Sequence, residues 1–163
     1  FMKFIYACDI HGDEYKFEKL LAEAIKQKIE YLVFGGDLLP KNCSDRYNEQ
    51  KIFIEQFLDH YFTKLNEKNI KCICILGNDD LERLDNIFEK ECSKFDNVFN
   101  IDNNKMDLED ISFIGLSKVL DHPFGCKDRV VIEEGLQMQL QLSTIQTSYI
   151  VVLGPLYFLR LIS

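Results

Sequence analysis

The sequence predicts an α/β fold in which a parallel sheet is covered by helices. In the first half of the chain, a short apolar run is followed three times by a segment whose apolar residues recur at helical spacing. Each apolar run ends in a break rich in Gly, Asp and Asn, as is typical of the end of a buried strand. The 163 residues, 47% hydrophobic and 28% charged, suit one globular domain and exclude collagen-like and wholly disordered proteins.

The elements of the first half follow from these patterns. We expect strands at residues 3–8, 31–34 and 71–76, and helices at residues 14–28, 52–65 and 81–88. Asp13 is suited to cap the first helix, and residues 38–48 form a polar loop after the second strand. Phe53, Phe57 and Tyr61 repeat at helical spacing, so they are expected to pack in the core.

The pattern changes after Cys92, where short apolar runs are joined by Asn and Asp turns. We expect strands at residues 98–101, 106–108, 111–115 and 148–153, and a helix at residues 131–142. The chain shows no internal repeat and no low-complexity linker, so we expect a single domain over residues 1–163.

Charge and cysteine content limit the classes of partner and the compartment. A net charge of −8 disfavours nucleic acid as a partner, but it allows a small phosphate ester, because one metal ion reverses the local field. The six cysteines include no CxxC pair, and no secretory signal is seen, so we expect reduced thiols and a cytoplasmic location. Cys72 and Cys74 lie on one face of a strand and are expected to be buried. The longest apolar run, residues 149–159, is too short to span a membrane.

Carboxylate, imidazole and amide side chains follow each of the first three strands. Asp9 and His11 follow the first strand and Asp37 follows the second. Asn78 and Asp79 follow the third. Because the carboxyl ends of parallel strands meet at one edge of a sheet, we expect these groups to converge. Oxygen and imidazole ligands suit Mn²⁺, Fe, Zn²⁺ or Mg²⁺, and Asp37, from the middle junction, is placed to bridge two metals.

Each cluster has a simpler interpretation when it stands alone. Asp9 suits a turn after a strand, and His11 suits a loop imidazole bonded to the backbone. Asp79 suits the N-cap of the third helix, with Glu82 three residues later. Arg46, in the polar loop, could reach a phosphate, although a solvated arginine is the more frequent case. Three such clusters in order, each after an apolar strand, favour one common site.

These blocks resemble the signature of the calcineurin-like metallophosphoesterases. That signature is D-x-H, G-D and G-N-H-[DE], followed by a lone His and a G-H-x-H block. The matching residues are Asp9-Ile10-His11, Gly36-Asp37 and Gly77-Asn78, at intervals similar to those of small members. The resemblance covers residues 2–118 and implies a two-sheet sandwich flanked by helices.

The resemblance also implies a site for two divalent metal ions. Asp9, His11 and Asp37 would hold one ion, and Asp37 would bridge to a second ion that Asn78 also binds. A hydroxide between the metals would attack phosphorus in line, with Asn78 and Asp79 beside the reacting group. The chain would then be a metal-dependent phosphoesterase acting on phosphodiesters or small phosphomonoesters.

Two departures from the signature are visible. Asp79 stands where the family has a His that stabilises or protonates the leaving oxygen. An aspartate beside two cations stays ionised and donates protons poorly, so we expect a preference for good leaving groups such as aryl esters. The late His and the G-H-x-H block are missing, and Leu153 stands where the late His would be. We therefore expect a fold shortened at the C-terminus and weaker metal binding. His60 and His122 fall in a helix pattern and a loop.

Two classes of function remain open. The three matching blocks favour an enzyme, whereas the missing histidines favour a degenerate, non-catalytic metal-binding or interaction module with the same fold. A haloacid-dehalogenase-type phosphatase is disfavoured, because His11 stands where that class needs a second aspartate. The apolar segment over residues 151–162, if exposed, would favour a homo-oligomer.

Overall fold

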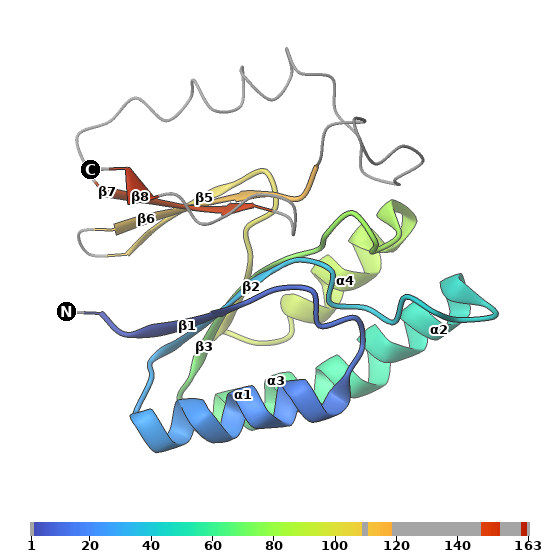
Figure 1. Cartoon of the computed structure of the whole chain (residues 1–163), viewed down its shortest axis with the longest axis horizontal. Coiled ribbons are helices and arrows are strands. Elements are labelled where there is room, and N and C mark those ends of the chain that lie inside the picture. The colour runs from blue at the N-terminus through green and yellow to red at the C-terminus, as the bar shows by residue number, and fades with distance from the viewer. Residues whose placement is uncertain (1, 109–110, 119–147, 154–160, 163) are drawn as a thin grey trace, which may run out of the picture.

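The computed structural model describes residues 2–108, 111–118, 148–153 and 161–162, and it is built in layers (Figure 1). The described helices lie on one face of a four-stranded sheet, and a second four-stranded sheet packs on the other face. The predicted two-sheet sandwich flanked by helices is therefore confirmed. The helix expected at residues 131–142 and the side chain of His122 lie outside the described residues.

The first sheet contains four parallel strands in the order β1-β2-β3-β4. Their bounds are Phe4–Ala7 for β1, Tyr31–Gly35 for β2, Lys71–Ile75 for β3 and Val98–Asn100 for β4. Phe4 pairs with Tyr31, which pairs in turn with Lys71, so the first three strands begin level with one another. Their carboxyl ends therefore reach the same edge of the sheet, as the sequence predicted.

The central strands are apolar along their whole length because both faces of the sheet are covered. In β3, Cys72 and Cys74 pack into the core beneath the helices, whereas Ile73 and Ile75 pack into the core between the two sheets. The two cysteines are fully buried, which confirms their predicted place. Strand β2 alternates between the two cores in the same way.

The first helix, α1, spans Glu14–Gln27. The Asp13 side chain caps it by accepting a hydrogen bond from the Lys16 amide at 3.2 Å, as predicted. Phe17 and Leu21 are buried on the face that α1 turns toward the sheet. This helix connects β1 to β2 and covers the sheet from below in Figure 1.

The second helical region begins earlier than predicted. Helix α2 spans Arg46–Ile52, a π-helical turn covers Phe53–Leu58, and α3 spans Asp59–Glu67. Residues 46–48 therefore belong to a helix, although they were assigned to the polar loop. The first turns of α2 carry no apolar periodicity, because the only side chain that α2 buries is the polar Gln50. Phe53 and Tyr61 are buried in the core, as expected.

The third helical region is a short 3₁₀ turn over Glu82–Leu84 followed by α4, Asp85–Cys92. Leu81 precedes this turn and caps it with no side-chain hydrogen bond. The interpretation of Asp79 as an N-cap is therefore wrong, and its side chain is used elsewhere.

The second sheet has the order β5-β6-β7-β8. Its strands are Lys105–Leu108, Ile111–Leu116, Ser148–Leu153 and Leu161–Ile162. β6 and β7 run parallel, and the other two pairs are antiparallel. The first three strands confirm the predicted ones, whereas β8 was not predicted. None of the helices in the described ranges is long and apolar enough to cross a membrane.

Candidate metal centre

We call the segments after β1, β2 and β3 that carry Asp9, Asp37 and Asn78 the first, second and third junctions. The first and second junctions run side by side at the carboxyl edge of the first sheet. The His11 amide donates to the Asp37 carbonyl at 2.9 Å, and the Gly12 amide donates to the Leu38 carbonyl at 2.8 Å. The parallel pairing of the two strands thus continues into the loops. It places the side chains of the first and second junctions next to each other.

The backbone of three junction residues is left-handed. The φ angles are 55° at Asp9, 53° at His11 and 53° at Asp37. This conformation costs an L residue about 1 kcal/mol or more, so it persists only where the surrounding bonds impose it. Such residues gather at functional sites more often than elsewhere, and here all three belong to the predicted metal-binding set.

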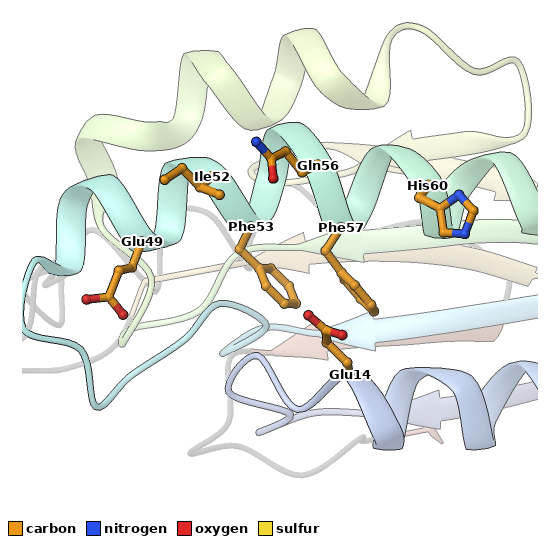
Figure 2. Close-up of a pocket in the computed structure, with 7 residues that line it drawn as sticks. All are labelled: Glu14, Glu49, Ile52, Phe53, Gln56, Phe57 and His60. Atoms are coloured by element: carbon orange, nitrogen blue, oxygen red, sulfur yellow. The ribbon is translucent and has the colours of Figure 1, made fainter.

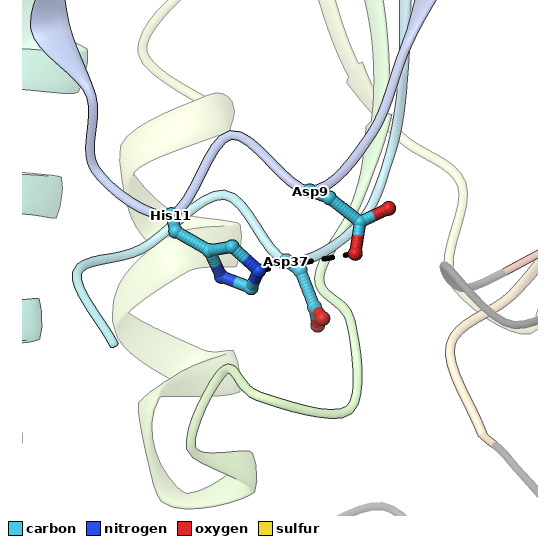
Figure 3. A group of neighbouring side chains, drawn as sticks. All are labelled: Asp9, His11 and Asp37. Carbon is cyan, nitrogen blue, oxygen red and sulfur yellow. Dashed lines mark ion pairs between the residues drawn. The ribbon is translucent and has the colours of Figure 1, made fainter. Parts of the chain in front are cut away.

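The side chains of these three residues converge on one point (Figure 3). One ligand atom from each of Asp9, His11 and Asp37 lies within 4.8 Å of the others. The His11 Nε2 atom is 3.8 Å from Asp9 Oδ1. Within the described ranges, no other group of His, Cys, Asp or Glu residues meets this condition. Asp37 is buried, His11 is half-buried and Asp9 is exposed, so the cluster opens to solvent on one side.

Two glycines let the third junction approach the second. A Cβ atom on Gly77 would overlap the Asp37 amide nitrogen, and one on Gly36 would lie 2.7 Å from the Gly77 Cα atom. The Asp79 amide then donates to Asp37 Oδ1 at 2.8 Å. Asn78, which lies between Gly77 and Asp79 in the third junction, is buried. The structure therefore brings all five predicted site residues to one edge of the sheet.

Asp80 holds the second and third junctions together. Its buried carboxylate accepts hydrogen bonds from the amides of Leu38 at 3.1 Å, Leu39 at 2.9 Å and Gly77 at 2.7 Å. Sequence reasoning did not assign this role to Asp80. The available signal was an acidic residue directly after the Gly77 turn, at the [DE] position of the family signature.

Gln50 is a second buried residue that links these loops, and the sequence did not reveal it. Its Nε2 atom donates to the carbonyls of Pro40 at 3.0 Å and Asp79 at 3.1 Å, and its Oε1 atom accepts from the Leu81 amide at 3.0 Å. The side chain is fully buried. Gln50 thus ties α2 to the second and third junctions, which explains why α2 buries a polar residue.

Asp79 is ion-paired with two basic residues. Its Oδ2 atom lies 2.5 Å from Lys41 Nζ, and its Oδ1 atom lies 3.9 Å from an Arg46 nitrogen. Arg46 also donates to the Asp79 carbonyl. The Asp79 side chain is 8% exposed, against 44% for Lys41 and 38% for Arg46. Arg46 is therefore attached to the third junction and is not simply solvated.

Asp37 lies in a buried place beside a second carboxylate, and both conditions disfavour its ionised form. Burial, and next the Asp80 carboxylate, raise the pKa of Asp37 to about 8. Burial, and next the Lys41 charge, lower the pKa of His11, so its imidazole is neutral at pH 7 and able to bind a metal. A cation at this point would favour the ionised form of Asp37.

The three side chains suit a divalent cation. The His11 ring turns its Nε2 atom toward Asp9, so the imidazole and the two carboxylates present ligand atoms to the same point (Figure 3). Two carboxylates and one imidazole form a set of hard and borderline ligands that first-row divalent metals and Mg²⁺ accept. The donor set, which includes a buried carboxyl group whose pKa a cation would lower, thus fits a bound divalent metal.

His60 lies apart from this centre. It is exposed and borders a groove of about 420 Å³ between the start of α1 and the helical region of α2 and α3 (Figure 2). Glu14, Phe53 and Phe57 also line the groove, and none of the three clustered residues does. His60 is therefore an exposed residue of the helical layer and takes no part in the cluster.

A sequence profile described as calcineurin-like phosphoesterase matches residues 2–153. The chain belongs to this family. Calcineurin-like phosphoesterases are metal-dependent hydrolases of phosphate esters, so the resemblance carried by the three junction blocks is confirmed. A comparison with curated proteins finds no match.

Solved structures show the same fold. One crystal structure superposes with a TM-score of 0.68 at 14% identity, covering 91% of this chain and 67% of its own. The crystal structure of TT1561 of Thermus thermophilus superposes with a TM-score of 0.60 at 13% identity, covering 93% of this chain and 68% of its own. At these identities the likeness concerns the fold alone.

Proposed function

We propose that this chain hydrolyses phosphodiesters or small phosphomonoesters at the centre built by the three junctions. The observation that carries the proposal is the convergence of Asp9, His11 and Asp37, with ligand atoms within 4.8 Å, in a calcineurin-like phosphoesterase. The open side of the cluster leaves room for a substrate that approaches from solvent.

Four side chains would hold the metal ions. Asp9, His11 and Asp37 would hold one ion, and Asp37 together with Asn78 would hold a second. Mn²⁺, Fe, Zn²⁺ and Mg²⁺ all suit this mixture of carboxylate, imidazole and amide ligands. A bound divalent cation supplies Lewis-acid polarisation of a phosphoryl oxygen.

The backbone amide and the side-chain carboxylate of Asp79 have separate roles. Its amide N–H holds the Asp37 carboxylate in place at 2.8 Å, which fixes the ligand shared by both ions. Its own carboxylate is ionised in the ion pair with Lys41, so it has no proton to give to a leaving oxygen. Esters whose leaving group needs no proton are therefore the favoured substrates.

The test is hydrolysis of bis(4-nitrophenyl) phosphate and 4-nitrophenyl phosphate with added Mn²⁺, Mg²⁺ or Zn²⁺, and with a chelator. We expect cation-dependent turnover that falls by at least about 100-fold in Asp37→Ala, because that variant removes the ligand shared by both ions. Asp96→Ala is the matched control, since Asp96 is exposed and precedes β4 at the opposite edge of the sheet.

The alternative is a non-catalytic module with the same fold. A folded chain that shows no turnover with any of the three cations would contradict the proposal and support this module. Turnover that persists in Asp37→Ala would place the chemistry at a different site.

A further inference from the structure

A lysine ammonium from the loop after β2 pairs with the third junction, at the residue that stands where the family signature has a histidine. Asp79 occupies the signature position, and Lys41 Nζ lies 2.5 Å from its carboxylate. The Asp79 side chain is 8% exposed and the Lys41 side chain 44%, so the pair consists of a buried anchor and a cation that faces solvent. Arg46 supports the same carboxylate from the other side at 3.9 Å.

The backbone before Lys41 is fixed against the first junction. A Cβ atom on Gly12, the residue after His11, would lie 2.6 Å from the Pro40 side chain, so the two residues are in close contact. The Pro40 carbonyl accepts hydrogen bonds from Gln50 at 3.0 Å and from the Cys43 thiol at 3.1 Å. The residue before Lys41 therefore contacts the residue after His11, and the Lys41 side chain pairs with Asp79.

The ammonium group lies within electrostatic reach of the metal-binding side chains. After burial, the Lys41 charge is the largest cause that lowers the pKa of His11. The hydrogen bond to Asp79, and to a smaller degree the charge of Asp37, raise the pKa of Lys41, so it stays protonated. The geometry agrees, because Lys41 Nζ is 2.5 Å from the carboxylate of Asp79, whose own amide donates to the metal-binding residue Asp37 at 2.8 Å.

We propose that Lys41 donates a hydrogen bond to the leaving oxygen of the phosphate ester, and that Asp79 positions it for this task. This inference rests on the proposed phosphoesterase function. When a water oxygen bonds to phosphorus, the bond to the leaving oxygen breaks and its electron pair stays on that oxygen. The ammonium N–H stabilises this negative charge, Lys41 keeps its proton, and the leaving oxygen takes its proton from water.

If Lys41 has this role, the loss of activity in a Lys41 variant should depend on the leaving group of the ester. An alkyl leaving group develops more negative charge than an aryl one, so it depends more on the Lys41 hydrogen bond. A purely structural ion pair would lower activity on all esters by the same factor. The dependence of the loss on the leaving group therefore separates the two roles.

The first experiment measures kcat/KM for Lys41→Met on phosphodiesters with 4-nitrophenyl, phenyl and methyl leaving groups. We expect a loss of a few-fold for 4-nitrophenyl that grows to about 100-fold for methyl, with partial recovery in Lys41→Arg. Lys64→Met is the matched control, because Lys64 is paired with Glu18 at 2.6 Å on the helical layer. An equal loss across the series, or no loss, would overturn the inference.

The second experiment does not depend on turnover. Inorganic phosphate carries an oxygen in the place of the leaving oxygen, and its binding in the presence of Mn²⁺ can be followed by equilibrium dialysis. We expect Lys41→Met to weaken binding about tenfold and Lys64→Met to leave it unchanged. Unchanged binding in Lys41→Met would overturn the inference and leave the phosphoesterase proposal intact. A chain that binds phosphate through Lys41 without hydrolysing esters would instead overturn the proposed function, and a chain that binds no phosphate would overturn both.

Discussion

Replacing Asp80 should loosen both the fold and the metal centre. Its carboxylate is fully buried and accepts three backbone hydrogen bonds, from the amides of Leu38, Leu39 and Gly77. Leu38 directly follows Asp37, and Gly77 directly precedes Asn78. Removal of the carboxylate therefore frees the two loops that carry the shared metal ligand and its neighbour.

The magnitude follows from the number of amides that lose their acceptor. A buried donor left without a partner costs about 1–3 kcal/mol, so Asp80→Ala should lose at least about 3 kcal/mol. Part of the loss is offset because the charge of Asp80 no longer repels that of Asp37. We expect a net loss of about 2–6 kcal/mol, a large share of the roughly 5–15 kcal/mol by which domains are stable. Asp80→Asn keeps one acceptor oxygen and should lose about 2–3 kcal/mol.

Urea unfolding followed by far-ultraviolet circular dichroism measures this effect. Asp96→Asn is the matched control, because Asp96 is exposed and should change the free energy of unfolding by less than about 0.5 kcal/mol. If Asp80→Asn also changes the free energy of unfolding by less than about 0.5 kcal/mol, the three hydrogen bonds do not anchor the loops. That result would refute the role of Asp80 in holding the two loops together.

Three further predictions concern packing, pH and substrate. Gly77→Ala places a Cβ atom inside contact distance of the Asp37 amide nitrogen, so it should cost about 1–3 kcal/mol in urea unfolding and weaken Mn²⁺ binding; a variant equal to the parent in both would contradict the close contact. Burial raises the pKa of Glu91, and the hydrogen bond from Lys94 opposes this rise only in part, so the folded chain holds this proton more tightly than the unfolded chain. Stability should therefore fall as the pH rises above the ordinary carboxyl range, and thermal melts should show a shallower fall in Glu91→Gln; an unchanged slope would exclude this residue as a cause. Because ionised Asp79 supplies no proton, aryl phosphodiesters should be hydrolysed faster than alkyl ones, and equal kcat/KM values would count against that role.

The parts of the fold that depend on local pattern were predictable from the sequence. β1, β2 and β3 are apolar runs ended by glycine and aspartate, and the Asp13 cap marks the start of α1. The convergence of Asp9, His11 and Asp37 followed from one topological rule, that parallel strands end at a common edge. These features need only the order of residues along the chain.

The features that depend on contacts distant in sequence were not predictable. Helix α2 begins in a polar stretch because its buried residue, Gln50, is held by the carbonyls of Pro40 and Asp79 and not by apolar packing. The pairing of Lys41 with Asp79 joins residues from two separate loops. No periodicity or motif marks such polar contacts, so only the folded arrangement reveals them.

The proposed function depends on a divalent-cation site formed by Asp9, His11 and Asp37. Titration of the chain with Mn²⁺, with free ion followed by electron paramagnetic resonance, tests it without reference to any substrate. We predict at least one bound Mn²⁺ per chain and an affinity that falls by about 100-fold or more in Asp37→Ala but not in Asp96→Ala. Equal affinity in Asp37→Ala, or no binding by the unchanged chain, would show that these three residues do not form a cation site.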